Sequence, residues 1–82
     1  MSLHDEAIAD IDEQIMDLFA ARSDYVAMQH AHLKTIGEPI WDQRKVDDTI
    51  DRYVEALGDI DGIRLATAVI GTKEQNEQLA GI

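Results

Sequence analysis

The first 36 residues contain neither glycine nor proline, and an apolar residue recurs at every third or fourth position. This spacing places the apolar side chains on one face of a helix and the acidic residues between them on the opposite face. The seam comprises Leu3, Ile8, Ile11, Ile15 and Leu18. Gly37 and Pro39 have the chemistry of a helix stop. The sequence therefore predicts a helix over residues 3–36, about 50 Å long at 1.5 Å per residue.

Two shorter helices are expected after this stop. Asp42 is the predicted N-cap of the second helix, and Gly58 is its predicted end. A third helix is expected to begin near Asp61 and to contain Gly71, which costs about 1 kcal/mol relative to alanine inside a helix. The segment 72–78 has no apolar residue, so it either frays or lines something polar. The sequence lacks the alternating apolar pattern, of period 2, that indicates strands. The predicted fold is therefore all-α, a single domain over 1–82 with one long and two short helices.

The long helix requires a partner. Two short helices cannot cover a helix of that length, and an 82-residue chain buries little surface alone. Cysteine is absent, so disulfides cannot supplement the core. The sequence therefore predicts a homodimer.

The charge and the missing motifs exclude several functions. A formal net charge of −10 repels phosphate backbones and anionic lipids, so neither nucleic acid nor a membrane is an expected partner. No apolar run is long enough to span a bilayer, and the N-terminal segment is acidic where a signal peptide would be basic, which indicates a cytoplasmic protein. The three histidines lack the helical spacing of metal ligands, so no metal is expected.

A basic residue interrupts the apolar seam of the long helix. Continued at the same spacing, the seam reaches four polar residues, Arg22, Tyr25, Gln29 and His32, before it returns to an apolar residue at Ile36. A guanidinium on a buried stripe needs an anion or hydrogen-bond acceptors. Arg22 therefore either forms a structural ion pair or lines a pocket for a carboxylate. Lys34, Arg44, Lys45 and Lys73 either converge with Arg22 or remain solvated.

Several motifs, in order along the chain, resemble the helical chorismate mutase family. The segment 8–22 resembles the opening Ile-Asp-x-Ile-Asp pattern that leads to a site arginine. The segment 37–42 is similar to the family's Gly-x-Pro-hydrophobic-x-Asp turn, and 50–53 is similar to the second helix of short actinobacterial members. The segment 23–26 is similar to the branch that removes pyruvate from isochorismate.

The resemblance implies an intertwined homodimer with two sites, each built from both long helices. The implied activity is isomerase activity, the Claisen rearrangement of chorismate, a small dicarboxylate, to prephenate in the shikimate pathway of aromatic amino acid biosynthesis. No cofactor is implied, since cations hold the carboxylates and donors stabilise charge on the breaking ether oxygen. Small members are sometimes activated by the first enzyme of the aromatic pathway, so such an enzyme is a further implied partner.

The family's site positions map onto this chain with substitutions. Arg22 falls on the arginine that grips a substrate carboxylate, Asp42 on the acid at the start of the second helix, and Lys45 on a position that is usually arginine. Lys73 and Glu77 fall on the last two site positions, the second of which is usually glutamine. A glutamate there must be protonated to donate a hydrogen bond, so activity would improve as the pH falls.

Other positions depart from the pattern. The expected lysine near the ether oxygen falls on Leu33, with Lys34 turned by about 100°. The expected glutamate falls on Val46, and the partner subunit's expected arginine falls on Asp5. Gln75 or Gln78 is an alternative to Glu77. These departures leave three functions open: a mutase acting on chorismate or an amino analogue, a lyase acting on isochorismate, and a non-catalytic binding or regulatory dimer.

Overall fold

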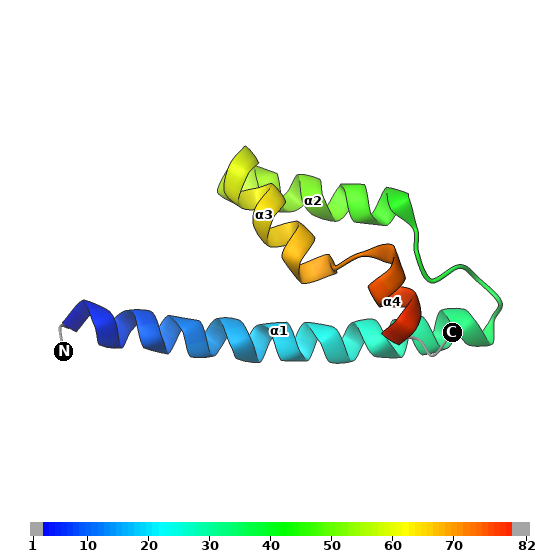
Figure 1. The fold of residues 1–82 in the computed structure, drawn as a ribbon, viewed down its shortest axis with the longest axis horizontal. Coiled ribbons are helices and arrows are strands. Elements are labelled where there is room, and N and C mark those ends of the chain that lie inside the picture. Colours follow the sequence, from blue (N-terminus) through cyan, green and yellow to red (C-terminus); the bar gives the residue numbers. More distant parts are fainter. Residues whose placement is uncertain (1–2, 80–82) are drawn as a thin grey trace.

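The computed structural model describes residues 3–79, so residues 1–2 and 80–82 of the predicted domain lie outside it. Four helices follow one another, and Figure 1 shows how they are arranged. They are α1 (Leu3–Thr35), α2 (Gln43–Leu57), α3 (Asp59–Ile70) and α4 (Lys73–Leu79). The predicted all-α class is confirmed, and the described residues contain no strand. None of these helices is long and apolar enough to cross a bilayer.

The long helix α1 sets the length of the molecule, whose largest dimension is 52 Å. It ends within one residue of the predicted boundary because Gly37 adopts a left-handed backbone conformation with φ of 76°. The amide of Glu38 then donates to the carbonyl of Leu33 at 2.9 Å, which satisfies one of the last helical carbonyls.

The predicted boundaries of α2 are confirmed. The Asp42 side chain accepts hydrogen bonds from the backbone amides of Arg44, at 3.0 Å, and Lys45, at 3.5 Å. Gly58 ends α2 with φ of 91°, and its amide donates to the carbonyl of Val54. Gly58 is the single residue between α2 and α3, and the chain reverses its direction there.

The predicted third helix differs from the structure at both ends. α3 begins at Asp59, two residues before the expected start, because Gly58 serves both helices. The prediction that Gly71 lies inside this helix is wrong, since its φ of 79° ends α3. The polar segment beyond it forms α4, which starts with a reciprocal capping box. The Thr72 amide donates to Gln75 Oε1 at 2.9 Å, and the Gln75 amide donates to Thr72 Oγ1 at 3.0 Å.

Helices α2 and α3 pack closely against each other. A Cβ atom at Gly62 would lie 2.5 Å from the Cα atom of Val54, so only glycine allows this approach. Ala66, one helical turn further along α3, is fully buried. Among residues 3–79 it is the one apolar side chain that is buried, so the chain has little core of its own.

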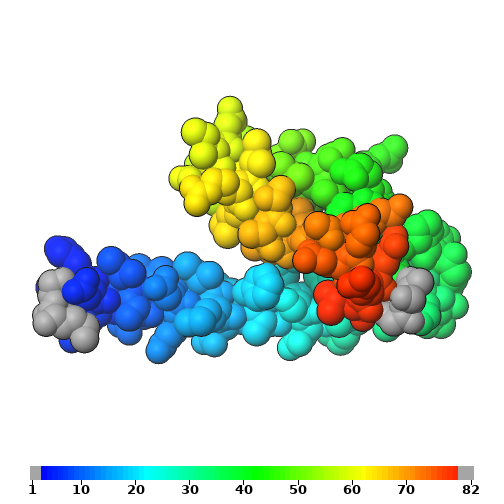
Figure 2. Space-filling view, viewed as in Figure 1, coloured from blue at the N-terminus to red at the C-terminus, as the bar shows by residue number. Residues whose placement is uncertain are grey.

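The N-terminal half of α1 carries the predicted apolar seam, but the rest of the chain does not cover it. Ile8, Ile11, Ile15 and Leu18 are 54–70% exposed. Figure 2 shows this half of the helix projecting beyond α2 and α3. The seam is therefore an apolar surface in the single chain.

The C-terminal half of α1 follows a different register from the predicted one. Tyr25 is 71% exposed and Ile36 is 54% exposed, whereas Val26, His30 and Leu33 are at least partly buried. A strict alternation of three and four residues drifts by about 20° per heptad on a straight helix. The inward stripe from Arg22 onward therefore follows the 3.6-residue period instead.

Candidate functional site

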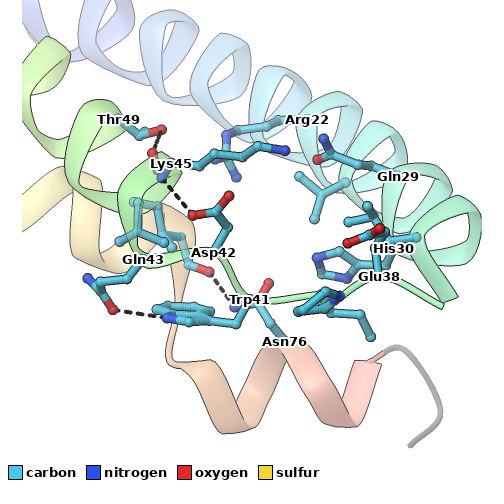
Figure 3. Close-up of a pocket in the computed structure, with 16 residues that line it drawn as sticks. Arg22, Gln29, His30, Glu38, Trp41, Asp42, Gln43, Lys45, Thr49 and Asn76 are labelled. Carbon is cyan, nitrogen blue, oxygen red and sulfur yellow. Dashed lines mark hydrogen bonds between the residues drawn. The ribbon is translucent and has the colours of Figure 1, made fainter. Parts of the chain in front are cut away.

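An open cavity of about 700 Å³ lies between the C-terminal half of α1 and the beginning of α2. The connection between these helices, with one side chain from α3 and one from α4, completes its wall (Figure 3). Its lining residues are Arg22, Val26, Gln29, His30, Leu33, Glu38, Pro39, Ile40, Trp41, Asp42, Gln43, Lys45, Val46, Thr49, Ile70 and Asn76. The volume is within the range of small-molecule sites.

Two cationic side chains, from two helices, meet in this cavity. Arg22 comes from α1 and Lys45 from the first turn of α2, and Figure 3 shows their side chains close together at one end of the cavity. Neither cation forms an ion pair or a side-chain hydrogen bond with any residue between 3 and 79. Two neighbouring cations repel each other, and an anion bound between them offsets this repulsion, so this end of the cavity favours an anionic group.

The third predicted binding residue, Asp42, also lines the cavity. Its carboxylate is the N-cap of α2 and accepts two backbone hydrogen bonds there. This cap positions the first turn of α2 and therefore the backbone of Lys45. The structure thus brings together three predicted site residues, Arg22, Asp42 and Lys45, and gives Asp42 a helix-capping contact.

The other predicted site residues lie elsewhere. Lys34, Lys73 and Glu77 line a second cavity of about 490 Å³. Residues 38–41 border both cavities, so this connection separates the two groups of basic residues. Lys73 Nζ lies 3.9 Å from Glu77 Oε1, one helical turn away on the surface of α4. Lys34 therefore does not converge with Arg22.

The wall near the two cations is partly apolar. Leu33 and Val46 both line the first cavity. Val26 and Ile70 extend the same wall. This surface suits the apolar body of a small ligand whose charged group is held by Arg22 and Lys45.

Other residues discussed from the sequence lie outside the first cavity. Asp5 is in the first turn of α1, about 25 Å along the helix axis from Arg22 of the same chain. Gln75 is used in the capping box of α4, and Gln78 lines neither of the two cavities. No group of three or more histidine, cysteine or acidic side chains in the described part of the chain could hold a metal ion.

Sequence reasoning missed three prominent residues of the cavity, His30, Trp41 and Asn76. His30 falls on the 3.6-residue stripe through Arg22 and Val26, which a true helical period would have identified. The capping-box pattern of Thr72 and Gln75 predicts the helix that carries Asn76. The Asn76 Nδ2 atom donates to the carbonyls of Ile70, at 2.9 Å, and Thr72, at 2.8 Å, and so fixes α4 to the end of α3.

The position of Trp41 follows from hydrogen bonds along the chain. Its Nε1 atom donates to Gln43 Oε1 at 3.0 Å, and Gln43 Nε2 donates to Asp47 Oδ1, also at 3.0 Å. These contacts hold the indole against the beginning of α2, where it borders both cavities.

Comparison with known proteins finds no matching family model, no matching curated protein and no matching solved structure.

Proposed function

We propose that the chain is a chorismate mutase-like isomerase that works as an intertwined homodimer, and that the cavity lined by Arg22 and Lys45 is its site. The observation that carries the proposal is the pair of unpartnered cations facing one cavity in a chain with a net charge of −10. A substrate with carboxylates supplies the missing anion. The order of the sequence motifs supports chorismate, or an amino analogue of it, as that substrate.

The cavity contains groups suited to this reaction. The Claisen rearrangement breaks one carbon–oxygen bond and forms one carbon–carbon bond within a single molecule, so no group has to accept a proton. Catalysis therefore depends on holding a compact conformation and on stabilising the ether oxygen as it gains negative charge. Arg22 and Lys45 would hold a carboxylate of the substrate. The side-chain amide of Gln29, which makes no hydrogen bond with residues 3–79, can donate to the ether oxygen.

The surface area supports the homodimer. The chain exposes 6587 Å², whereas a compact monomer of its mass exposes about 4,900 Å². Two chains that each hid the excess would bury about 3,300 Å² together, which is within the range of obligate homodimers. The exposed seam of α1 continues directly into the stripe that contains Arg22, so a second α1 packed on the seam would extend the wall of the cavity.

A non-catalytic binding dimer is the second candidate, and the separation of the two cavities favours it. Lys34, Lys73 and Glu77 lie across the connecting segment from Arg22, and Leu33 and Val46 leave apolar surface where the family has charged groups. Such a site would retain the carboxylate contact and lose the donors that lower the barrier. Each lost donor in a preorganised site costs roughly 3 to 4 kcal/mol of transition-state stabilisation.

A turnover assay separates these functions. The purified protein is incubated with chorismate and, separately, with isochorismate, and prephenate is resolved from salicylate and pyruvate. Prephenate supports the mutase, whereas salicylate with pyruvate identifies the lyase reaction on the same scaffold. Binding of chorismate without either reaction supports the non-catalytic candidate, and the absence of both binding and turnover contradicts the proposal.

A pair of matched variants locates the site. Lys45→Gln removes a cation from the first cavity, and Lys73→Gln removes one from the second. We expect Lys45→Gln to lower turnover at least tenfold, because a charged contact to the substrate is worth about 1.5–3 kcal/mol. Lys73→Gln should retain the activity of the unmodified protein. The opposite result would place the site in the second cavity.

A further inference from the structure

The cavity contains a histidine that the proposed reaction has not used. His30 lies on α1 two turns after Arg22, and its residue surface is 7% exposed. It lines the first cavity, and Figure 3 shows its imidazole directed from α1 into that space. The other two histidines of the chain, His4 and His32, are exposed.

The ring nitrogens of His30 have no partner within the described chain. The His30 side chain takes part in no hydrogen bond or ion pair with residues 3–79. Within residues 3–79, every side-chain nitrogen or oxygen that is fully enclosed has a hydrogen-bond partner. The nitrogens of His30 are therefore accessible, and the opening available to so buried a side chain is the cavity. A polar group placed in this way needs a hydrogen-bond partner from solvent or from a ligand.

The spacing along α1 limits the kind of ligand that can meet both residues. His30 follows Arg22 by eight positions, which corresponds to about 12 Å along the helix axis. Both side chains lie on the cavity face, so a ligand between them needs an anionic group at one end and a hydrogen-bonding group at the other. The apolar side chain of Leu33 lies on the same face of α1, where it lines the cavity beside this stripe. A small anion with one charged group and no second polar group, held at Arg22, would not reach His30.

We propose that His30 is a ligand-binding residue that hydrogen-bonds to the second polar end of an anion held by Arg22 and Lys45. This inference rests on the anion site of the proposed function and adds a contact to it. Imidazole can both donate and accept, so it suits a carboxylate, a hydroxyl or an ether oxygen at that position. Asn76 supports the arrangement from α4, because both of its amide hydrogens are used in holding that helix over the cavity.

The direct test is nuclear magnetic resonance of the three imidazole rings in the unmodified protein. Chorismate is titrated while the carbon-bound ring protons of the histidines are followed. We expect the His30 resonance to shift in a saturable manner, whereas the resonance of His32, which lines neither cavity, acts as an internal control and stays in place. Arg22→Ala should abolish the shift at the same chorismate concentration.

Calorimetry on variants gives the second measurement. His30→Ala should weaken chorismate binding about tenfold, the value of one hydrogen bond in a desolvated site, and His32→Ala should leave it unchanged. His30→Gln, which keeps a donor and an acceptor, should restore part of the affinity. Circular dichroism checks that each variant retains its helices, and the resonance shift of the unmodified protein decides the matter if His30→Ala does not fold.

The outcomes separate this inference from the proposed function. If chorismate binds and requires Arg22, but the His30 resonance does not move and His30→Ala binds normally, the role of His30 is wrong and the proposed function stands. If chorismate does not bind, suberate is titrated as a dicarboxylate long enough to extend between the two residues. A shift of His30 by suberate that requires Arg22 would support His30 and refute chorismate as the substrate. Failure of both probes would overturn both proposals.

Discussion

Replacing Ile15 with aspartate tests whether the seam of α1 is an interface between two copies of the chain. Ile15 is one of the five apolar residues of the seam and is 55% exposed in the single chain. Full burial of an isoleucine side chain stabilises by about 2 kcal/mol, so burying the exposed half contributes about 1 kcal/mol per chain. A dimer contains two such positions, which gives about 2 kcal/mol in total.

The new carboxylates add a second penalty. Placing a charge against apolar surface costs at least about 1 kcal/mol in each chain after relaxation. The two effects together amount to about 4 kcal/mol, which weakens the dimer roughly a thousandfold. Sedimentation equilibrium over a range of protein concentrations measures this change, and circular dichroism reports whether the helices persist.

Ala20→Asp is the matched control. It adds the same charge to the same helix, on the face about 160° away from Arg22, where Ala20 is exposed. We expect this variant to associate as the unmodified protein does. A dimer that is equally strong in Ile15→Asp, or an unmodified protein that is monomeric at every concentration, would refute the reasoning.

Two further predictions concern the frame that holds the cavity. Gly62→Ala should lower the free energy of unfolding by about 2 kcal/mol in denaturant titration, against the usual preference of helices for alanine, because its Cβ would collide with the backbone of Val54. Arg64→Ala on the exposed face of the same helix should change it by less than about 0.5 kcal/mol, and equal effects would contradict the close packing. Asp42→Ala should cost about 1 kcal/mol by the same measurement because α2 loses its cap. An unchanged unfolding curve would show that the cap contributes nothing.

Local chemistry made most of the helix boundaries predictable. Asp42 and Gly58 act on their own backbone neighbours, so their roles depend on few distant contacts. The apolar pattern runs to Ile70 and gives no sign that one helix ends there and another begins, so it places Gly71 inside the third helix. The reciprocal pattern of Thr72 and Gln75 carries that information instead.

The candidate site was predictable only in part, for geometric reasons. Arg22 follows from the helical period of α1, and Lys45 follows from a cap that fixes the first turn of α2. The path of residues 36–42 begins at Gly37, which has a φ of 76°, and sequence periodicity does not describe the course of such a connection. Because this connection lies between the two cavities, Lys34 and Lys73 line the second cavity and are separated from Arg22 in the first.

Calorimetric titration of chorismate into the protein and into Arg22→Ala tests most directly whether the cavity between α1 and α2 binds a carboxylate. Arg64→Ala is the control, since its guanidinium lies on the surface, 3.7 Å from Asp61. A charge-assisted contact contributes about 1.5–3 kcal/mol, so Arg22→Ala should bind at least tenfold more weakly. Its circular dichroism spectrum should match that of the unmodified protein. If Arg22→Ala instead bound chorismate with unchanged affinity and lost only stability, Arg22 would be a structural residue and the cavity would not be the binding site.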